Sequence, residues 1–280
     1  MDLELSGKRA VVTGGSRGIG LAVARALAAE GCDVALVARD AAALAAAREA
    51  VAAVPSAAVP AAAVPAAGGS GRRVIAVSCD TGDDEAVREM AAAVADGLGG
   101  ADILVNAAAR PNTGAAVGID GFDGAEFAEQ VNVKVLGYLR CIKAMVPLMR
   151  ENRWGRIINV SGLAARSTGA ITGTVRNVAV AALTKNLADE LGRDGINVNV
   201  VHPGFTLTEK TQDMLAGRAA RAGVPVGEVE RQIGASVSIG RIVTADEVAS
   251  VVAFLASPRS VAINGDAIAV GGGAVGPIFY

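Results

Sequence analysis

The 280-residue sequence has little of the chemistry that most enzyme sites use: one histidine, two tyrosines, one tryptophan and three cysteines. The single histidine, His202, excludes a Ser-His-Asp triad elsewhere in the chain and most histidine-based metal sites. Cys32, Cys79 and Cys141 stand far apart without paired spacing. We therefore expect small buried thiols in a reducing compartment rather than a disulfide framework, and we predict no metal site.

A strong excess of charge and long apolar runs are also missing. The net charge is −2 at pH 7 with lysine and arginine scattered along the chain, which argues against nucleic acid as a main partner. No stretch of about 20 residues is apolar enough to span a membrane. The charged residues 1–9 run straight into a predicted strand, so we expect no signal peptide and a cytoplasmic protein.

What is present is a regular alternation of apolar strand-like runs with helical ones. Strands are predicted at Arg9–Thr13, Asp33–Ala38, Val74–Ser78, Ile103–Asn106, Arg156–Ser161, Asn197–His202 and Ala267–Val270. Helices are predicted near Ile19–Ala29, Ala41–Val54, Asp83–Gly97, Gly124–Arg150, Val175–Leu191 and Ala245–Ser257. This order predicts an α/β fold: a Rossmann-type, doubly wound parallel sheet of about seven strands with helices on both faces.

No linker interrupts the alternation, so a single domain over residues 1–280 is expected. Residues 54–71 depart from the pattern, because valine-proline recurs there every five residues. Proline at that frequency forbids a helix, and the segment is interpreted as a tolerated low-complexity insertion.

A glycine-rich loop follows the first predicted strand and opens the first helix. Gly14, Gly18 and Gly20 allow a tight turn and close approach of the backbone to a pyrophosphate. The free N–H groups at the helix start favour an anion at the same place. The loop therefore predicts a dinucleotide site.

Several further segments stand in an order that makes the chain recognisable. They are TGGSRGIG at 13–20, CD at 79–80, DILVNAAA at 102–109, VNV around Asn132, RIINVS at 156–161, INVNVVHPGFTLT at 196–208 and EVASVVAFLAS at 247–257. With them the sequence resembles the short-chain dehydrogenase/reductase family over nearly its whole length. The resemblance implies an oxidoreductase that acts on a carbonyl or hydroxyl group of a small molecule with a nicotinamide cofactor.

The resemblance also assigns cofactor contacts. The residues so implied are Thr13, Gly14, Ser16, Arg17, Gly18, Ile19, Gly20, Arg39, Asp80, Asn106, Pro203, Gly204 and Thr208. Cofactor choice follows from charge at the end of the second strand. Ala38 stands where an NAD enzyme would place its carboxylate, and Arg39 and Arg17 suit a 2′-phosphate. NADP(H) is therefore favoured over NAD(H), with Asp40 as the contrary observation.

The family's usual catalytic set is an asparagine, a serine and a Y-x-x-x-K pair. Asn132 is present, and the serine is Ser161 unless a shifted gap puts Gly162 in its place. Aligning the end of the helix places Gly173 at the tyrosine position and Asn177 at the lysine position. The proposed catalytic residues are therefore Ser161, Asn132 and Asn177, in an atypical site without the usual acid.

Three functions stay open at this point. The first is a variant oxidoreductase, the second a non-redox lyase or dehydratase on the same scaffold, and the third a cofactor-binding protein without catalysis. Residues 205–240 are expected to cover the substrate. The helices at 124–150 and 175–191 carry more apolar positions than one buried stripe needs, which indicates a homodimer or homotetramer.

Overall fold

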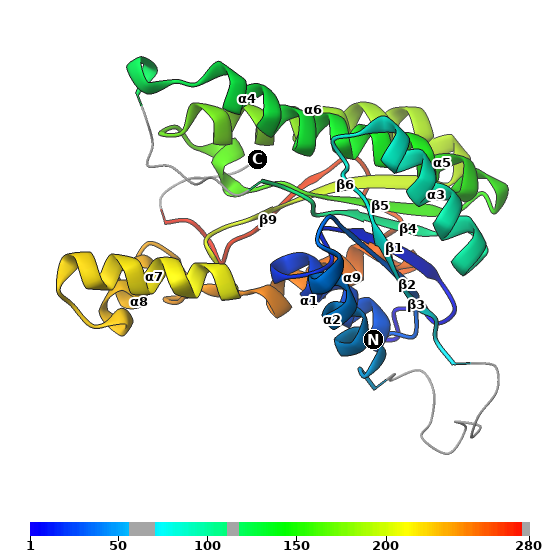
Figure 1. Ribbon diagram of the computed structural model, residues 1–280, viewed down its shortest axis with the longest axis horizontal. Helices are drawn as coiled ribbons and strands as arrows, with labels where there is room; N and C mark the ends of the chain where they lie inside the picture. Colours follow the sequence, from blue (N-terminus) through cyan, green and yellow to red (C-terminus); the bar gives the residue numbers. More distant parts are fainter. Residues whose placement is uncertain (56–70, 111–117, 276–280) are drawn as a thin grey trace.

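A computed structural model describes residues 1–55, 71–110 and 118–275 of the chain. The core is a seven-stranded parallel sheet in the order β3-β2-β1-β4-β5-β6-β9 (Figure 1). The strands are β1 (Arg9–Thr13), β2 (Asp33–Ala38), β3 (Val74–Ser78), β4 (Ile103–Asn106), β5 (Gly155–Val160), β6 (Ile196–Pro203) and β9 (Ala267–Val270). The predicted doubly wound fold is thus confirmed.

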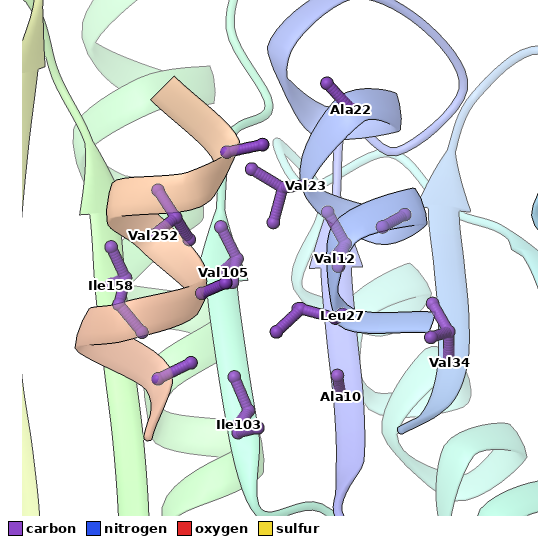
Figure 2. Close-up of a cluster of buried hydrophobic side chains, with 14 of the residues drawn as sticks. Ala10, Val12, Ala22, Val23, Leu27, Val34, Ile103, Val105, Ile158 and Val252 are labelled. Carbon is purple, nitrogen blue, oxygen red and sulfur yellow. The ribbon is translucent and has the colours of Figure 1, made fainter. Parts of the chain in front are cut away.

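Helices cover both faces of this sheet (Figure 1). One face carries α1 (Gly18–Ala29), α2 (Ala41–Ala52) and α9 (Ala245–Ala256), and the other carries α3 (Asp84–Leu98), α5 (Gly137–Glu151) and α6 (Ile171–Leu191). Figure 2 shows the first layer, where Val23 and Leu27 of α1 and Val252 of α9 meet strand side chains such as Val12 and Val105. Strands buried on both sides require the near-continuous apolar runs that the sequence shows.

The order of the strands reverses between β1 and β4. Thr13, the last residue of β1, pairs with Val37 of β2 on one side and with Asn106 of β4 on the other. Because the two crossover series lead away from this point, a crevice opens at the carboxyl ends of the strands. This crevice is where ligands bind in sheets of this kind.

The predicted helix at Gly124–Arg150 is wrong as one regular element. It consists of α4 (Gly124–Val131), a π-helical turn η3 (Asn132–Leu136) and α5. A turn with i→i+5 bonding adds a residue and rotates the side chains that follow, which hydrophobic periodicity alone does not reveal. Helix α6 begins four residues earlier than the predicted Val175, at Ile171.

The segment 205–240 contains a short strand and two helices. They are β7 (Thr206–Leu207), which pairs with β8 (Val243–Thr244), then α7 (Glu209–Ala222) and α8 (Val226–Gly234). The helices pack on each other through Leu215, Ala219 and Val229 and extend beyond the end of the sheet (Figure 1). Most of the low-complexity insertion predicted at 54–71 lies outside the described residues, which leave out 56–70. Cys32, Cys79 and Cys141 are free and buried, as expected of small apolar thiols.

Candidate active site

The glycine loop joins β1 to α1 with almost no room for side chains. Gly14 and Gly18 have positive φ angles of 68° and 55°, a region that glycine enters without strain. A Cβ atom on Gly20 would lie 2.2 Å from the carbonyl oxygen of Gly14. A Cβ on Gly14 would meet the backbone of Ala107 and Ala108 at 2.8 Å. The backbone itself forms the cradle.

A cavity of about 720 Å³ lies over this loop, along the carboxyl ends of the strands. Its walls include Gly14, Ser16, Arg17, Ile19, Gly20, Ala38, Arg39, Asp40, Asp80, Ala107, Lys134, Val160, Ser161 and Thr208. Nine of the residues proposed from the sequence therefore share one pocket: Gly14, Ser16, Arg17, Ile19, Gly20, Arg39, Asp80, Ser161 and Thr208. We call the part around the glycine loop, Arg39 and Asp80 the β2 end, and the part around Lys134, Val160 and Ser161 the β5 end.

The β2 end carries two cations that face solvent, Arg17 and Arg39, and it has Ala38 where an NAD enzyme would place its carboxylate. Arg39 is about half exposed, and its Nη1 lies 3.8 Å from Asp80 Oδ2. Asp40 accepts from the N–H groups of Ala42 and Ala43 with one oxygen and so caps the start of α2. Asp40 therefore has a structural task, which weakens it as an argument for a ribose diol.

The remaining proposed cofactor residues lie around the pocket rather than in its wall. Thr13 Oγ1 accepts from the N–H groups of Ala107 and Ala108, which fixes β1 to the loop after β4. Asn106 is fully buried and donates to Asn159 of β5. Gly204, which follows Pro203 of β6, lies so close to Gly271 that a Cβ on it would come within 3.0 Å of that backbone. These residues shape the strand ends.

Helix α7 begins directly beside the glycine loop. Thr208 caps α7 in a reciprocal bond with Thr211, and a Cβ on Gly18 would lie 3.6 Å from Thr208. Glu209 Oε2 accepts from the backbone N–H of Gly18 at 3.2 Å. A side chain of the 205–240 segment thus occupies a donor of the loop in which an anion would bind.

The three proposed catalytic residues do not converge on one point. Asn132 turns toward α3, because its Nδ2 donates to Gly82 O and its Oδ1 accepts from Arg140. Ser161 Oγ donates to the backbone carbonyl of Asn177 at 3.1 Å, which fastens β5 to α6. The Asn177 side chain is buried, and its Oδ1 has no partner among the described residues.

Residue 162, rather than residue 161, faces the side chain of Asn177. A Cβ on Gly162 would lie 3.2 Å from Asn177 Nδ2, so a serine at 162 would point at the side chain of residue 177. The geometry therefore favours the shifted register, in which glycine stands at both the serine and the tyrosine positions. Gly173 is buried in the first turns of α6.

Lys134 is a residue of the pocket wall that the sequence alone did not indicate. It is 4% exposed, lines the pocket and donates from Nζ to the carbonyl oxygen of Ser161 at 3.0 Å. Burial, together with the positive charge of Arg176, lowers the pKa of Lys134 to about 7. The available signal was a lysine placed among apolar residues two positions after Asn132.

Tyr138, the nearby phenol, is bonded to the backbone and stays protonated near neutral pH. Its hydroxyl donates to Val160 O at 2.8 Å, and burial raises its pKa far above neutrality. The second tyrosine, Tyr280, lies outside the described residues. Neither supplies an acid near pH 7 in the part of the chain that the structure describes.

The pocket fits a dinucleotide. The cradle, which a Cβ would fill, leaves backbone N–H groups at the start of α1 for a diphosphate, and Arg39 stands where the ribose of the adenosine half would be held. Sheet order, switch point and glycine cradle together define a dinucleotide-binding α/β protein.

A family model described as enoyl-(acyl carrier protein) reductase matches residues 14–275. The short-chain reductase protein NovJ of Streptomyces niveus is 34% identical over 94% of this chain and 92% of its own length. A 3-oxoacyl-[acyl-carrier-protein] reductase FabG of Vibrio cholerae is 30% identical over 97% of this chain and 98% of its own.

The chain therefore belongs to the short-chain dehydrogenase/reductase family. Solved structures agree with this assignment. An L-sorbose reductase from Gluconobacter frateurii, complexed with NADPH and L-sorbose, superposes with a TM-score of 0.87 at 29% identity. The match covers 99% of this chain and 100% of that one. An actinorhodin polyketide ketoreductase variant with NADPH gives a TM-score of 0.82 at 29% identity, over 95% and 96% of the two chains.

Neither a membrane-spanning helix nor a cluster of metal ligands occurs among the described residues. None of the helices there is long and apolar enough to cross a membrane. Within the same ranges, no three side chains of His, Cys, Asp or Glu gather closely enough to hold a metal ion.

Proposed function

We propose that the protein is an NADP(H)-dependent oxidoreductase that interconverts a carbonyl and a hydroxyl group on a small molecule, in a site without the usual tyrosine and lysine. The observation that carries the proposal is the backbone cradle with Arg39 at its β2 end. Several relatives are named as reductases, and several structural neighbours are complexed with NADPH. When bound, NADPH would supply the hydride.

The chain's own residues then divide the remaining work. The N–H groups of the glycine loop bind diphosphate, and the guanidinium of Arg39 attracts a 2′-phosphate that a carboxylate would repel. The α7–α8 unit, which begins beside Gly18, covers the substrate. Asn177, with its unpartnered Oδ1, offers a buried hydrogen-bond acceptor on α6.

Selectivity between the two cofactors tests the proposal. Arg39→Ala should weaken NADPH binding about tenfold, which corresponds to one lost charge-assisted contact, and should leave NADH binding nearly unchanged. Arg48→Ala is the matched control, because Arg48 is an exposed arginine on the neighbouring helix α2. Fluorescence titration gives both dissociation constants, and NADPH oxidation with a panel of ketones tests turnover.

Tighter binding of NADH by the unmodified protein would overturn the cofactor assignment. Tight NADPH binding with no turnover of any carbonyl would favour the second candidate, a cofactor-binding protein without catalysis. That candidate has its own support, since glycine stands at position 173 and position 162. The lyase alternative has no observation in its favour.

We also propose that α5 and α6 mediate a homodimer or homotetramer. Four apolar side chains on these helices are each at least 40% exposed: Leu136 and Leu139 at the start of α5, and Val175 and Val178 on α6. Apolar side chains gathered on neighbouring helices are typical of an interface between subunits. Val178→Glu should lower the mass measured by light scattering, whereas Val261→Glu, on an exposed turn elsewhere, should not.

A further inference from the structure

Lys134 stands at the one irregular turn of the α4–α5 helix. It lies in the middle of η3 and reaches the pocket wall beside Val160 and Ser161. π-Helical turns are rare and occur often at functional sites, because the extra residue redirects a side chain. The redirected side chain here is a nearly buried ammonium group.

The groups that face Lys134 come from three other elements. Arg176 of α6 is cationic, buried, and bonded through Nη1 to Gln130 Oε1 and Arg110 O. His202 of β6 is neutral near pH 7, because burial and the charges of Arg166 and Lys134 lower its pKa to about 4. Tyr138 of α5 is neutral because its pKa is raised.

The groups around Lys134 lower the pKa of its ammonium group. A fixed guanidinium and a dry environment both disfavour a second positive charge, so the Lys134 ammonium gives up its proton near neutral pH. Neither His202 nor Tyr138 can take over that role, since each is far from its own titration range at pH 7. Arg176 cannot, since a guanidinium keeps its proton.

Unpartnered polar atoms mark the same neighbourhood. Arg176 Nε and Asn177 Oδ1 are two of the buried side-chain atoms that have no hydrogen-bond partner among the described residues. Leaving such an atom unpaired destabilises a protein, so these atoms are typical of a place that a ligand or water completes. They lie on α6, the helix from which the usual acid is missing.

We propose that Lys134 is the catalytic residue that exchanges the proton with the substrate's oxygen, in place of a tyrosine on α6. The inference rests on the proposed function and deepens it. In reduction, the carbonyl carbon accepts the hydride of the reduced nicotinamide cofactor. The carbonyl oxygen takes the proton of the Lys134 ammonium, which leaves a neutral amine and an alcohol.

A solvent proton then restores the ammonium, and oxidation of the alcohol runs through the same steps in reverse. Atoms and charge balance in each direction with the cofactor as the only redox partner. Lys134 lines the pocket, and the hydrogen bond to Ser161 O holds Nζ in place.

The test combines a titration with kinetics. The chain has five lysines, so lysine labelled with ¹³C at Cε gives few NMR signals, and loss of one signal in Lys134→Met assigns it. We expect this signal to titrate near pH 7. This readout needs neither cofactor nor turnover.

Kinetics with NADPH and an accepted ketone then compare three variants. Lys134→Met removes the proton donor, and Lys134→Arg keeps the charge but cannot release a proton at neutral pH. Both should lower kcat about a hundredfold or more, which is the usual contribution of a general acid. Lys143→Met, at an exposed lysine of α5, should change nothing. Wild-type reduction should slow as pH rises through about 7.

The outcomes separate the two proposals. A Lys134 signal that titrates near pH 10, or full kcat in Lys134→Met and Lys134→Arg, would overturn the role of Lys134 and leave the oxidoreductase standing. Absence of turnover in the wild type would overturn the proposed function, and the role of Lys134 with it. Unchanged NADPH binding in the variants shows that their folds are intact.

Discussion

The β2 end and the β5 end of the pocket lie along the same sheet edge but are built on different principles. At the β2 end the backbone makes the site: glycines 14 and 20 have no room for a Cβ, and Asp40 is committed to the cap of α2. At the β5 end, individual side chains make it, and two buried polar atoms on α6 lack partners in the described structure.

The contrast shows that cofactor binding and proton transfer can vary independently of each other. A binding cradle made of backbone is distorted by a side chain added at Gly14 or Gly20, so its shape depends on the loop as a whole. Proton transfer depends on one or two side chains with a suitable pKa, and a neighbouring turn can supply such a group. The proposed function therefore combines a complete dinucleotide cradle with an unusual acid.

Rebuilding the usual acid at the β5 end should produce the largest effect. The triple variant Gly162→Ser, Gly173→Tyr, Asn177→Lys places a phenol and an ammonium four residues apart on one face of α6. With the phenol pKa lowered by the ammonium, NADPH-dependent kcat on a small diketone should rise about a hundredfold. The single variants, which serve as controls, should each do far less.

Combining the triple variant with Lys134→Met tests whether Lys134 is still needed once a tyrosine is present. In the rebuilt background the loss of Lys134 should hardly matter, whereas in the natural background it should be severe. A rebuilt variant that binds NADPH normally and reduces no faster would show that the register of α6 differs from the one assumed.

An added methyl group at the β2 end should abolish much of its function. In Gly20→Ala the new Cβ would lie 2.2 Å from Gly14 O, so the loop must shift. Such overpacking costs about 1–3 kcal/mol, and NADPH affinity should fall roughly tenfold to a hundredfold. Gly227→Ala on α8 is the control, because among the described residues an added Cβ there would meet no other element within 4 Å. Equal affinity in the two variants would contradict a backbone-built cradle.

The same contrast decides which parts of the site can be predicted from the sequence. Thr13, Gly14 and Gly20 are predictable because strand, loop and helix leave a fixed spacing in the chain. Lys134 is not, because its burial depends on a π-helical turn that changes the phase of the helix. The pairing of positions 162 and 177 likewise depends on how a loop connects β5 to α6, which no periodicity encodes.

Lys134 should also affect stability, with a definite dependence on pH. Its folded pKa of about 7 lies below the ordinary value of 10.5, so between these values the unfolded chain binds more protons. The free energy of unfolding therefore rises with pH across that window, and the cost of the buried charge is complete below it. Lys134→Met should melt a few degrees above the wild type near neutral pH, with a margin that shrinks toward pH 10.

The exposed Lys143→Met is the control for this stability effect, because its melting temperature should follow the wild type at every pH. A margin for Lys134→Met that grows with pH would mean that the ammonium is stabilised by its surroundings, contrary to the burial and the Arg176 charge described here. Thermal melts followed by circular dichroism measure both.

The smallest expected effect lies where α7 meets the glycine loop. Glu209 Oε2 accepts from Gly18 N–H at 3.2 Å, at a helix start that attracts anions. A bound diphosphate would compete with this carboxylate for the donor and would be repelled by its charge. Glu209→Gln should therefore tighten NADPH binding by about two- to fivefold, the scale of one interaction at a helix terminus.

The control for this prediction is Asp213→Asn. Asp213 is exposed and lies one turn further along α7, so the change removes the same charge without touching the loop. An equal gain in both variants would reduce the contact to a general effect of charge on α7. A gain in Glu209→Gln alone would mean that cofactor binding must release α7 from Gly18, and so couples the β2 end to the segment that covers the substrate.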